Sequence, residues 1–319
     1  VIGIGGTIRN LAKIHQRYSG YPLSKLHNYK VSSQGLLSVI HMILKSPPEE
    51  RRKIPGLSAE RGDIINAGAL IVREILTLTK AESLTISGCG LREGLFYPIY
   101  DKNKELQHNM LLSSVRNYYS TLPLKDHDHT RYVTALALSM FDQWRKIYQM
   151  PDRMRTLLHM AGLLHDAGQV INYYSHARHS AYMTANAHIF GWSHKEQVLC
   201  ALITAFHHGF SGKILKSIKE TQILTEKEID RVKILSAFLA LAESLDENHE
   251  QCISQVICTS TPSSLNIHIY LNRDNFIVPA HATKKIISAY EKLCHYPLTI
   301  QWFPSSRQKD LIKEMARSL

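Results

Sequence analysis

Five side chains capable of metal or acid–base chemistry recur along a stretch of sequence that otherwise has the character of buried helix. His129 begins "HTRYVTALALSMFDQW", the pair His165-Asp166 lies in "LLHDAGQ", and Glu243 and Asp246 lie in "LALAESLD". Imidazole and carboxylate groups bind divalent ions and leave positions open for water and phosphate oxygens. Burying both kinds of group costs free energy unless something satisfies them.

Helical spacing directs these side chains toward one interior. Apolar residues recur three and four positions away from each of them, which is typical of the buried face of a helix. We predict that the first four meet in one cluster with Asp246 nearby, and that His179 and His207 lie on two further helices. The shared faces are His129 with Val133, Leu136, Met140 and Trp144; His165 with Met154, Leu158 and Ala161; and Glu243 with Val232, Ser236 and Leu239.

Two interpretations of this cluster are open. His129, His165, Asp166 and Glu243 are a sufficient set for a divalent ion, with Asp246 close by. Alternatively, a protonated His129 or His165 pairs with Asp166 or Glu243, which satisfies the buried carboxylates without a metal. We favour the metal-free ion pairs, because such networks mimic functional sites.

Two glycine-containing turns offer a different chemistry. "GIGGT" and "SGCGLREG" each follow a strand pattern and open a helix. Such a turn presents free backbone N–H groups and the positive end of a helix dipole to an anion. Arg92 adds a forked donor suited to phosphate. The alternative is that the glycines only make tight turns. The predicted phosphate-binding residues are Gly5, Gly6, Thr7, Gly88, Gly90, Arg92 and Glu93.

The elements that position these residues fall into three zones. Strand and helix patterns alternate over residues 1–105, helical patterns alone fill 106–250, and alternating strands with helices occupy 251–319. We therefore predict an α/β domain, an all-α domain and a small α+β module. Within them we expect Thr7 to cap the first helix, a helix over 58–79 with Ile64, Gly68, Ile71, Ile75 and Leu78 on its face, and a closing helix over 305–319.

Composition limits the functional classes. The net charge of +11 and pI near 9.3 favour a polyanionic partner, but no recognition motif for specific nucleic acid stands out. The sequence has no apolar run long enough to cross a bilayer. Five cysteines, none spaced as C-x-x-C, indicate reduced thiols and a cytoplasmic protein.

The motifs also carry a family resemblance. The spacing of His129, His165-Asp166 and a late acid resembles the HD superfamily of metal-dependent phosphohydrolases, with Glu243 where Asp is usual and Gln169 where Lys is usual. "GIGGTIRNLA", "ERGDIINAGALIV" and "ISGCGLREGLFY", followed by the HD-like region, are similar in order to the exopolyphosphatase/guanosine pentaphosphate phosphatase (Ppx/GppA) family. The likeness covers essentially the whole chain.

This resemblance implies a fold and an activity. The fold would be multidomain α/β plus all-α: a partial actin-like (ribonuclease H-like) lobe, an HD-like helical domain and a small C-terminal α+β module. The activity would be Mg²⁺-assisted hydrolysis of terminal phosphoanhydrides of inorganic polyphosphate or guanosine pentaphosphate, by a cytoplasmic homodimer. Both glycine turns would line the cleft, and Arg61 and Asp63 would match an "R-x-D-I-I" segment with a packing or cleft-lining role.

The resemblance also implies that part of the catalytic site lies outside this sequence. The family's first lobe, its catalytic glutamate and an acidic glycine loop would precede Val1. We therefore expect a fragment whose catalytic residues lie outside this sequence and which is inactive alone. Two alternatives remain: an HD-type metal-dependent nucleotide phosphohydrolase, or a non-catalytic regulator that binds an alarmone or polyphosphate.

Overall fold

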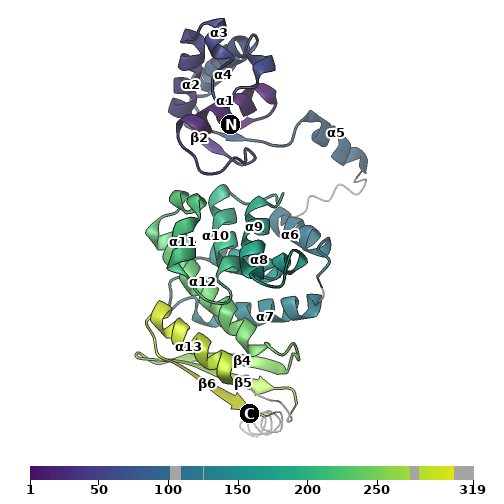
Figure 1. Ribbon diagram of the computed structural model, residues 1–319, viewed down its shortest axis with the longest axis vertical. Helices are drawn as coiled ribbons and strands as arrows, with labels where there is room; N and C mark the ends of the chain where they lie inside the picture. Colours follow the sequence, from purple (N-terminus) through teal and green to yellow (C-terminus); the bar gives the residue numbers. More distant parts are fainter. Residues whose placement is uncertain (101–108, 125, 274–279, 305–319) are drawn as a thin grey trace. The chain divides into compact units, whose positions relative to one another are not determined.

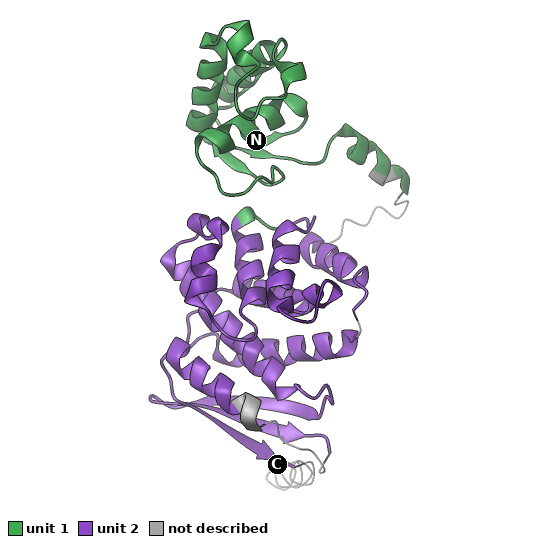
Figure 2. Ribbon diagram, in the orientation of Figure 1, with its two compact units in different colours: residues 1–108, 192–194 green, residues 109–191, 195–319 purple. Residues whose placement is uncertain are grey.

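The chain forms two compact units, described from a computed structural model (Figures 1 and 2). The structure describes residues 1–100, 109–124, 126–273 and 280–304. The first unit comprises residues 1–108 and 192–194, and the second comprises 109–191 and 195–319. Residues 251–319 group with the helical unit rather than separately, the predicted boundary near 105 lies outside the described residues, and the three-domain division stays a prediction.

The first unit is an α/β layer built on a small mixed sheet. Its strand order is β1-β3-β2, with β1 parallel and β2 antiparallel to β3. Helices α1, α2 and α4 supply most of the buried side chains that pack with this sheet. The elements are β1 (Ile2–Gly3), α1 (Gly6–Tyr18), β2 (Lys30–Ser32), α2 (Ser33–Lys45), α3 (Pro48–Arg51), a 3₁₀ turn (Ala59–Arg61), α4 (Ile65–Thr79), β3 (Ser83–Ile86) and α5 (Leu91–Tyr100).

Two local predictions in this unit are wrong. Thr7 does not cap α1: the helix begins two residues earlier than such a cap implies, after Gly5, whose φ of 102° is a left-handed conformation suited to glycine. The predicted face of α4 is also the wrong one, because Leu78 is 80% exposed while Leu76 is buried. The helix has apolar residues on more than one side, and periodicity does not tell which side meets the core. The buried side carries Ile65, Ala69 and Leu76, and the exposed side carries Ile64, Ile71, Ile75 and Leu78.

The second unit is helical up to its last strands, as predicted for the described residues. Helix α12 (Glu226–Leu245) packs against both α7 (His127–Trp144) and α8 (Asp152–Leu164) (Figure 1). Its start is fixed by a capping box, in which Thr225 and Glu228 bond each other's backbone N–H groups. The remaining elements are α6 (Met110–Ser120), a 3₁₀ turn (Ala167–Val170), α9 (His176–Asn186), α10 (His194–Ala205), α11 (Gly212–Ser217) and a 3₁₀ turn (Lys219–Ile223).

The second unit ends in a three-stranded sheet of order β4-β5-β6. Strands β4 (Ile253–Ser260) and β5 (Leu265–Leu271) are antiparallel, and β6 (Leu298–Phe303) is parallel to β5. Helix α13 (Ala280–Cys294) connects β5 to β6 and packs on α12. The predicted helix over 305–319 lies outside the described residues.

Two global features accompany this architecture. All five cysteines are free. Among the helices in the described parts of the chain, none has the combination of length and apolar character needed to cross a membrane.

Candidate functional site

The two glycine turns lie at the same edge of the first sheet. Strands β1 and β3 are parallel neighbours, with Gly3 in register with Ile86, so their carboxyl ends open on one side. "GIGGT" leaves β1 into α1, and "SGCGLREG" leaves β3 into α5. The first turn of α1 contains no acidic residue, which leaves the positive end of its dipole unopposed.

Arginine side chains gather around these turns. The guanidinium of Arg61 lies against Gly6, where an added Cβ would come within 2.3 Å of Nη2. Arg9 donates from Nε to the Gly5 carbonyl at 3.2 Å. Asp63, by contrast, pairs with Arg52 at 2.9 Å on the exposed surface. Arg61 thus lies beside the first turn. Arg9 was not predicted, because nothing but its position one turn into the helix distinguishes it in the sequence.

Four of the predicted phosphate-binding residues have partners within the chain. The Gly90 N–H donates to Glu93 Oε2 at 2.7 Å, and the Gly88 N–H donates to His27 Nδ1 at 3.0 Å. Hydrogen bonds from its own N–H and from Gly90 lower the pKa of the Glu93 carboxyl, with help from Arg92 and Arg9. The Thr7 side chain packs against Gly68 on α4. A phosphate that accepted the Gly88 and Gly90 N–H groups would have to displace His27 Nδ1 and Glu93 Oε2.

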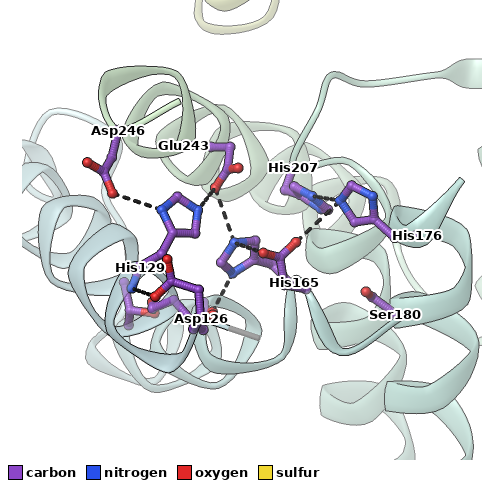
Figure 3. A network of polar contacts seen from close by, with 12 residues as sticks. Asp126, His129, His165, His176, Ser180, His207, Glu243 and Asp246 are labelled. Carbon is purple, nitrogen blue, oxygen red and sulfur yellow. Dashed lines mark hydrogen bonds and ion pairs between the residues drawn. The ribbon is translucent and has the colours of Figure 1, made fainter. Parts of the chain in front are cut away.

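The second unit brings the five polar residues of the helical core into one network (Figure 3). We call His129, His165, Asp166, Glu243 and Asp246 the His/acid cluster. His129 Nδ1 lies 2.8 Å from Asp246 Oδ2, and its Nε2 lies 3.3 Å from Glu243 Oε2. The same Glu243 oxygen is 3.1 Å from His165 Nε2, which is 3.7 Å from Asp166 Oδ2.

Helix ends hold this cluster in place. His165 follows the last residue of α8, and its Nδ1 donates to the Gly162 carbonyl at 2.6 Å. Asp246 ends α12 and accepts the Gln251 N–H through Oδ1 at 2.7 Å. Asp126 caps α7 by accepting the His129 N–H at 2.8 Å. His165 and Asp246 are therefore each fixed by a backbone contact as well as by a side-chain partner.

The charges in the cluster stabilise one another. Burial lowers the pKa of His129, but the Asp246 hydrogen bond and the Glu243 ion pair outweigh burial and raise it to about 10. Burial is likewise outweighed at His165, where Asp166 and Glu243 raise the pKa to about 9. Burial raises the pKa of the Asp166 and Glu243 carboxyls, but the neighbouring imidazoles outweigh burial and lower it to well below the ordinary range. In the cluster, protonated imidazoles therefore alternate with ionised carboxylates, and each charge is stabilised by a neighbour of opposite sign.

A second group of imidazoles adjoins the cluster. We call His176, His207 and His208 the histidine trio. His176 Nε2 lies 3.1 Å from His207 Nε2 and 3.0 Å from His208 Nε2. It also lies 3.3 Å from Asp166 Oδ1, so this carboxylate faces His165 with one oxygen and His176 with the other.

Sequence reasoning found only part of this neighbourhood. His179 lies on α9 as predicted, with its Cβ against Gly168, whereas His207 lies just beyond the end of α10 rather than on it and belongs to the trio. The available signals were the paired histidines of "AFHH" and the three-residue spacing in "SHARHS". His249 was also missed: its ring stacks on His129 with centroids 3.7 Å apart.

Comparison with known proteins relates both units to one family. Residues 1–103 match the family model described as "Ppx/GppA phosphatase family", and residues 114–283 match "Ppx/GppA phosphatase, domain III". The second match alone covers more than half of the 319 residues.

Individual relatives agree with these matches. Over 243 residues the chain is 26% identical to the guanosine-5'-triphosphate,3'-diphosphate pyrophosphatase of Aeromonas salmonicida, covering 75% of this chain and 46% of that protein. The protein of the same name from Aeromonas hydrophila is 25% identical over 242 residues, with the same coverage. The chain thus spans about half the length of the curated relatives it matches. The crystal structure of the Aquifex aeolicus Ppx/GppA family member is 29% identical over 33% of this chain and 35% of that chain, with a TM-score of 0.29.

Proposed function

The chain belongs to the Ppx/GppA phosphatase family, and on that premise we propose that it is part of an enzyme that hydrolyses a terminal phosphoanhydride of guanosine pentaphosphate or inorganic polyphosphate. The two Aeromonas relatives carry the name of a pyrophosphatase acting on guanosine-5'-triphosphate,3'-diphosphate, which supports the nucleotide substrate. The proposal includes a cytoplasmic homodimer and, for residues 1–105, part of an actin-like lobe.

One observation carries this proposal: two glycine turns and three arginines share the carboxyl edge of β1 and β3. Ligands of open α/β sheets bind outside the carboxyl ends of the strands. Backbone N–H groups at the start of α1 would hold the terminal phosphate, while Arg9, Arg61 and Arg92 neutralise its charge. Binding and orientation of this kind are the main contributions that a protein makes to phosphoryl transfer.

The complete protein would use Mg²⁺ to polarise the phosphoryl oxygens. Magnesium requires several oxygen ligands in near-octahedral geometry. Glu93 is the carboxylate that the two turns provide, and its Oε2 already accepts the Gly90 N–H. These residues do not form a magnesium site by themselves, so the proposal assigns metal binding and the catalytic base to the remainder of the complete protein.

The helical unit fits the proposal as an HD-like domain with a structural cluster. The alternation of imidazole and carboxylate in the His/acid cluster supports ion pairs rather than a metal at His129, His165 and Glu243. A net charge of +11 supports a role for the chain in attracting a long polyanion.

The test is binding of a phosphate-rich ligand to the purified chain. We expect Arg92→Ala to weaken the affinity for polyphosphate and for guanosine pentaphosphate, and to reduce the slope of log affinity against log salt by about 1. The matched control is Arg73→Ala, because Arg73 is an exposed arginine of the same unit that pairs with Glu74 on α4. Equal affinity of the parent and Arg92→Ala at every salt concentration would refute the assignment of the cleft.

A further inference from the structure

We propose that His27 is a phosphate-binding residue of the glycine-turn site, whose imidazole exchanges its hydrogen bond with Gly88 for a contact with the bound anion. His27 would thereby join the site of the proposed function, on which this assignment rests. The ring has two states. When neutral, it occupies the Gly88 N–H; when protonated, it leaves this N–H to the anion and donates to the anion itself.

His27 lies at the carboxyl edge of the first sheet. Strand β2 runs antiparallel to β3, with Lys30 opposite Thr85, so the residues just before β2 lie beside the carboxyl end of β3. The second glycine turn begins at that end. A Cβ added to Gly88 would come within 2.9 Å of the His27 Cβ, so the histidine lies directly against the turn.

The hydrogen bond from Gly88 defines where the ring carries its proton. The Gly88 N–H donates to His27 Nδ1 at 3.0 Å, so Nδ1 carries a lone pair and a neutral ring holds its proton on Nε2. A neutral His27 therefore takes the N–H that a phosphate oxygen would need. Protonation of Nδ1 turns this acceptor into a donor. The same proton thus releases the Gly88 N–H and places a positive charge beside the anion.

The backbone around His27 is held in place, so the exchange requires only the side chain to turn. The His27 carbonyl accepts His194 Nε2–H at 2.9 Å, from a segment that belongs to the first unit. The Asn28 N–H donates to the Ile86 carbonyl, and the Asn28 side-chain amide donates to the Trp192 carbonyl, each at 2.8 Å. Asn28 has a left-handed φ of 63°, which asparagine tolerates better than most residues. These contacts keep His27 beside the turn whichever partner its ring contacts.

Of the two bonded histidines, His27 is the one that gains the proton. His194 Nδ1 accepts the Tyr21 hydroxyl at 3.0 Å, while its Nε2 donates to the His27 carbonyl. Burial lowers the pKa of His194, and the charges of Lys25 and His27 lower it further. His194 therefore stays neutral and keeps its bond to the His27 backbone.

The charged groups of the turns do not titrate in the same range. The N–H groups of Glu93 and Gly90 lower the pKa of the Glu93 carboxyl, and Arg92 and Arg9 lower it further. Glu93 therefore remains ionised between about pH 5 and 8, where a histidine changes its charge. A change in anion affinity at Gly88 over that range is thus a property of His27.

The experiment is a titration with sodium sulfate, a tetrahedral dianion whose own charge is constant between about pH 5.5 and about pH 8.5. Protein labelled with ¹⁵N-glycine reports binding through the Gly88 amide signal. We expect the parent to bind sulfate at least about fivefold more tightly at the lower pH, as one added charge-assisted hydrogen bond implies. Without sulfate, the hydrogen-exchange protection factor of the Gly88 amide should be higher at the higher pH.

Three variants separate the acceptor from the charge. His27→Asn keeps an acceptor in the place of Nδ1 but does not titrate, so it should bind sulfate at both pH values as weakly as the parent does at the higher pH. His27→Leu removes both acceptor and charge, so it should bind more tightly than the parent at the higher pH and less tightly at the lower pH. His41→Asn, at an exposed histidine of the same unit, should keep the parental pH dependence.

Folding of each variant is checked by circular dichroism. A parental pH dependence in His27→Asn, or the same order of the parent and His27→Leu at both pH values, would overturn the assignment of His27. Arg92-dependent sulfate binding without these effects overturns that assignment alone. Sulfate binding that is equal in the parent and Arg92→Ala overturns the phosphate site of the proposed function, and the role of His27 with it.

Discussion

The charge on His129 makes a specific prediction for Asp246→Asn. This substitution keeps the shape of the side chain and removes the negative charge 2.8 Å from His129 Nδ1. Both side chains are buried, at 0% and 3% exposure, so solvent screening is weak. The variant therefore tests how much the imidazolium contributes to stability.

The magnitude follows from the pKa of His129. A rise from the ordinary 6.5 to about 10 corresponds to about 4.8 kcal/mol, at about 1.4 kcal/mol for each pH unit. Glu243 supplies part of this stabilisation and remains in the variant. We expect Asp246→Asn to lower the free energy of unfolding by about 2–3 kcal/mol at pH 6, similar to the loss of one member of a buried ion pair.

The pH dependence has a defined sign. The pKa of His129 is higher in the folded state than in the unfolded state, so its stabilisation is fully present below about pH 6.5 and is lost as pH rises through about 10. The difference between parent and variant should therefore shrink between pH 6 and pH 10.

Urea unfolding followed by tryptophan fluorescence measures this difference. The control is Asp230→Asn, because Asp230 is 64% exposed in its pair with Lys233 and should contribute no more than about 1 kcal/mol. A loss below about 0.5 kcal/mol in Asp246→Asn at pH 6, or a difference that does not change with pH, would refute a charged His129.

Three further outcomes are expected. The 319 residues alone should release phosphate from polyphosphate with Mg²⁺ far more slowly than the roughly 1–10³ s⁻¹ of ordinary enzymes, and turnover in that range would show that the chemistry resides in this chain. Gly168→Ala should lower the free energy of unfolding by more than about 2 kcal/mol, because the new Cβ would meet the backbone of α9. Gly212→Ala places its Cβ in open space and should be neutral or stabilising. Equal melting temperatures of the two variants would contradict the packing around Gly168. Leu76→Ala should cost about 2–5 kcal/mol and Leu78→Ala less than about 0.5 kcal/mol in urea unfolding, and the reverse order would restore the face of α4 predicted from sequence.

Helical periodicity predicted the interior of the second unit well. On α7 the buried residues recur three and four positions from His129, so the inward face is clear, whereas α8 is buried on every side over residues 160–164, so His165 must lie in the interior whichever face is chosen. The same reasoning failed on α4, where Ile71 and Leu76 lie on different apolar sides and packing against α1 and α2 decides which side is buried. Strand β2 was missed because three residues, Lys30–Ser32, show too little alternation to predict a strand.

The sequence predicted more of the glycine-turn site than of the histidine trio. The edge that carries both glycine turns follows from the order of strand, turn and helix in the sequence. The partners of the turns do not, because His27 and Arg61 reach Gly88 and Gly6 from distant segments. The histidine trio was beyond periodicity, since His176 begins a helix and His208 follows one, where no repeating pattern marks the inward direction.

The cluster also has a consequence for how the chain is made. The His129–Asp246 hydrogen bond joins residues 117 positions apart, and α12 supplies both carboxylates that His129 contacts. Until α12 leaves the ribosome and docks, His129 lacks both of its buried carboxylate partners and His165 has only Asp166. Long-range closure of this kind slows folding, and domains generally fold as units during synthesis. The ion pairs of His129 are therefore completed late, when α12 docks, and a nascent chain arrested before residue 226 should remain open to proteolysis at α7 and α8.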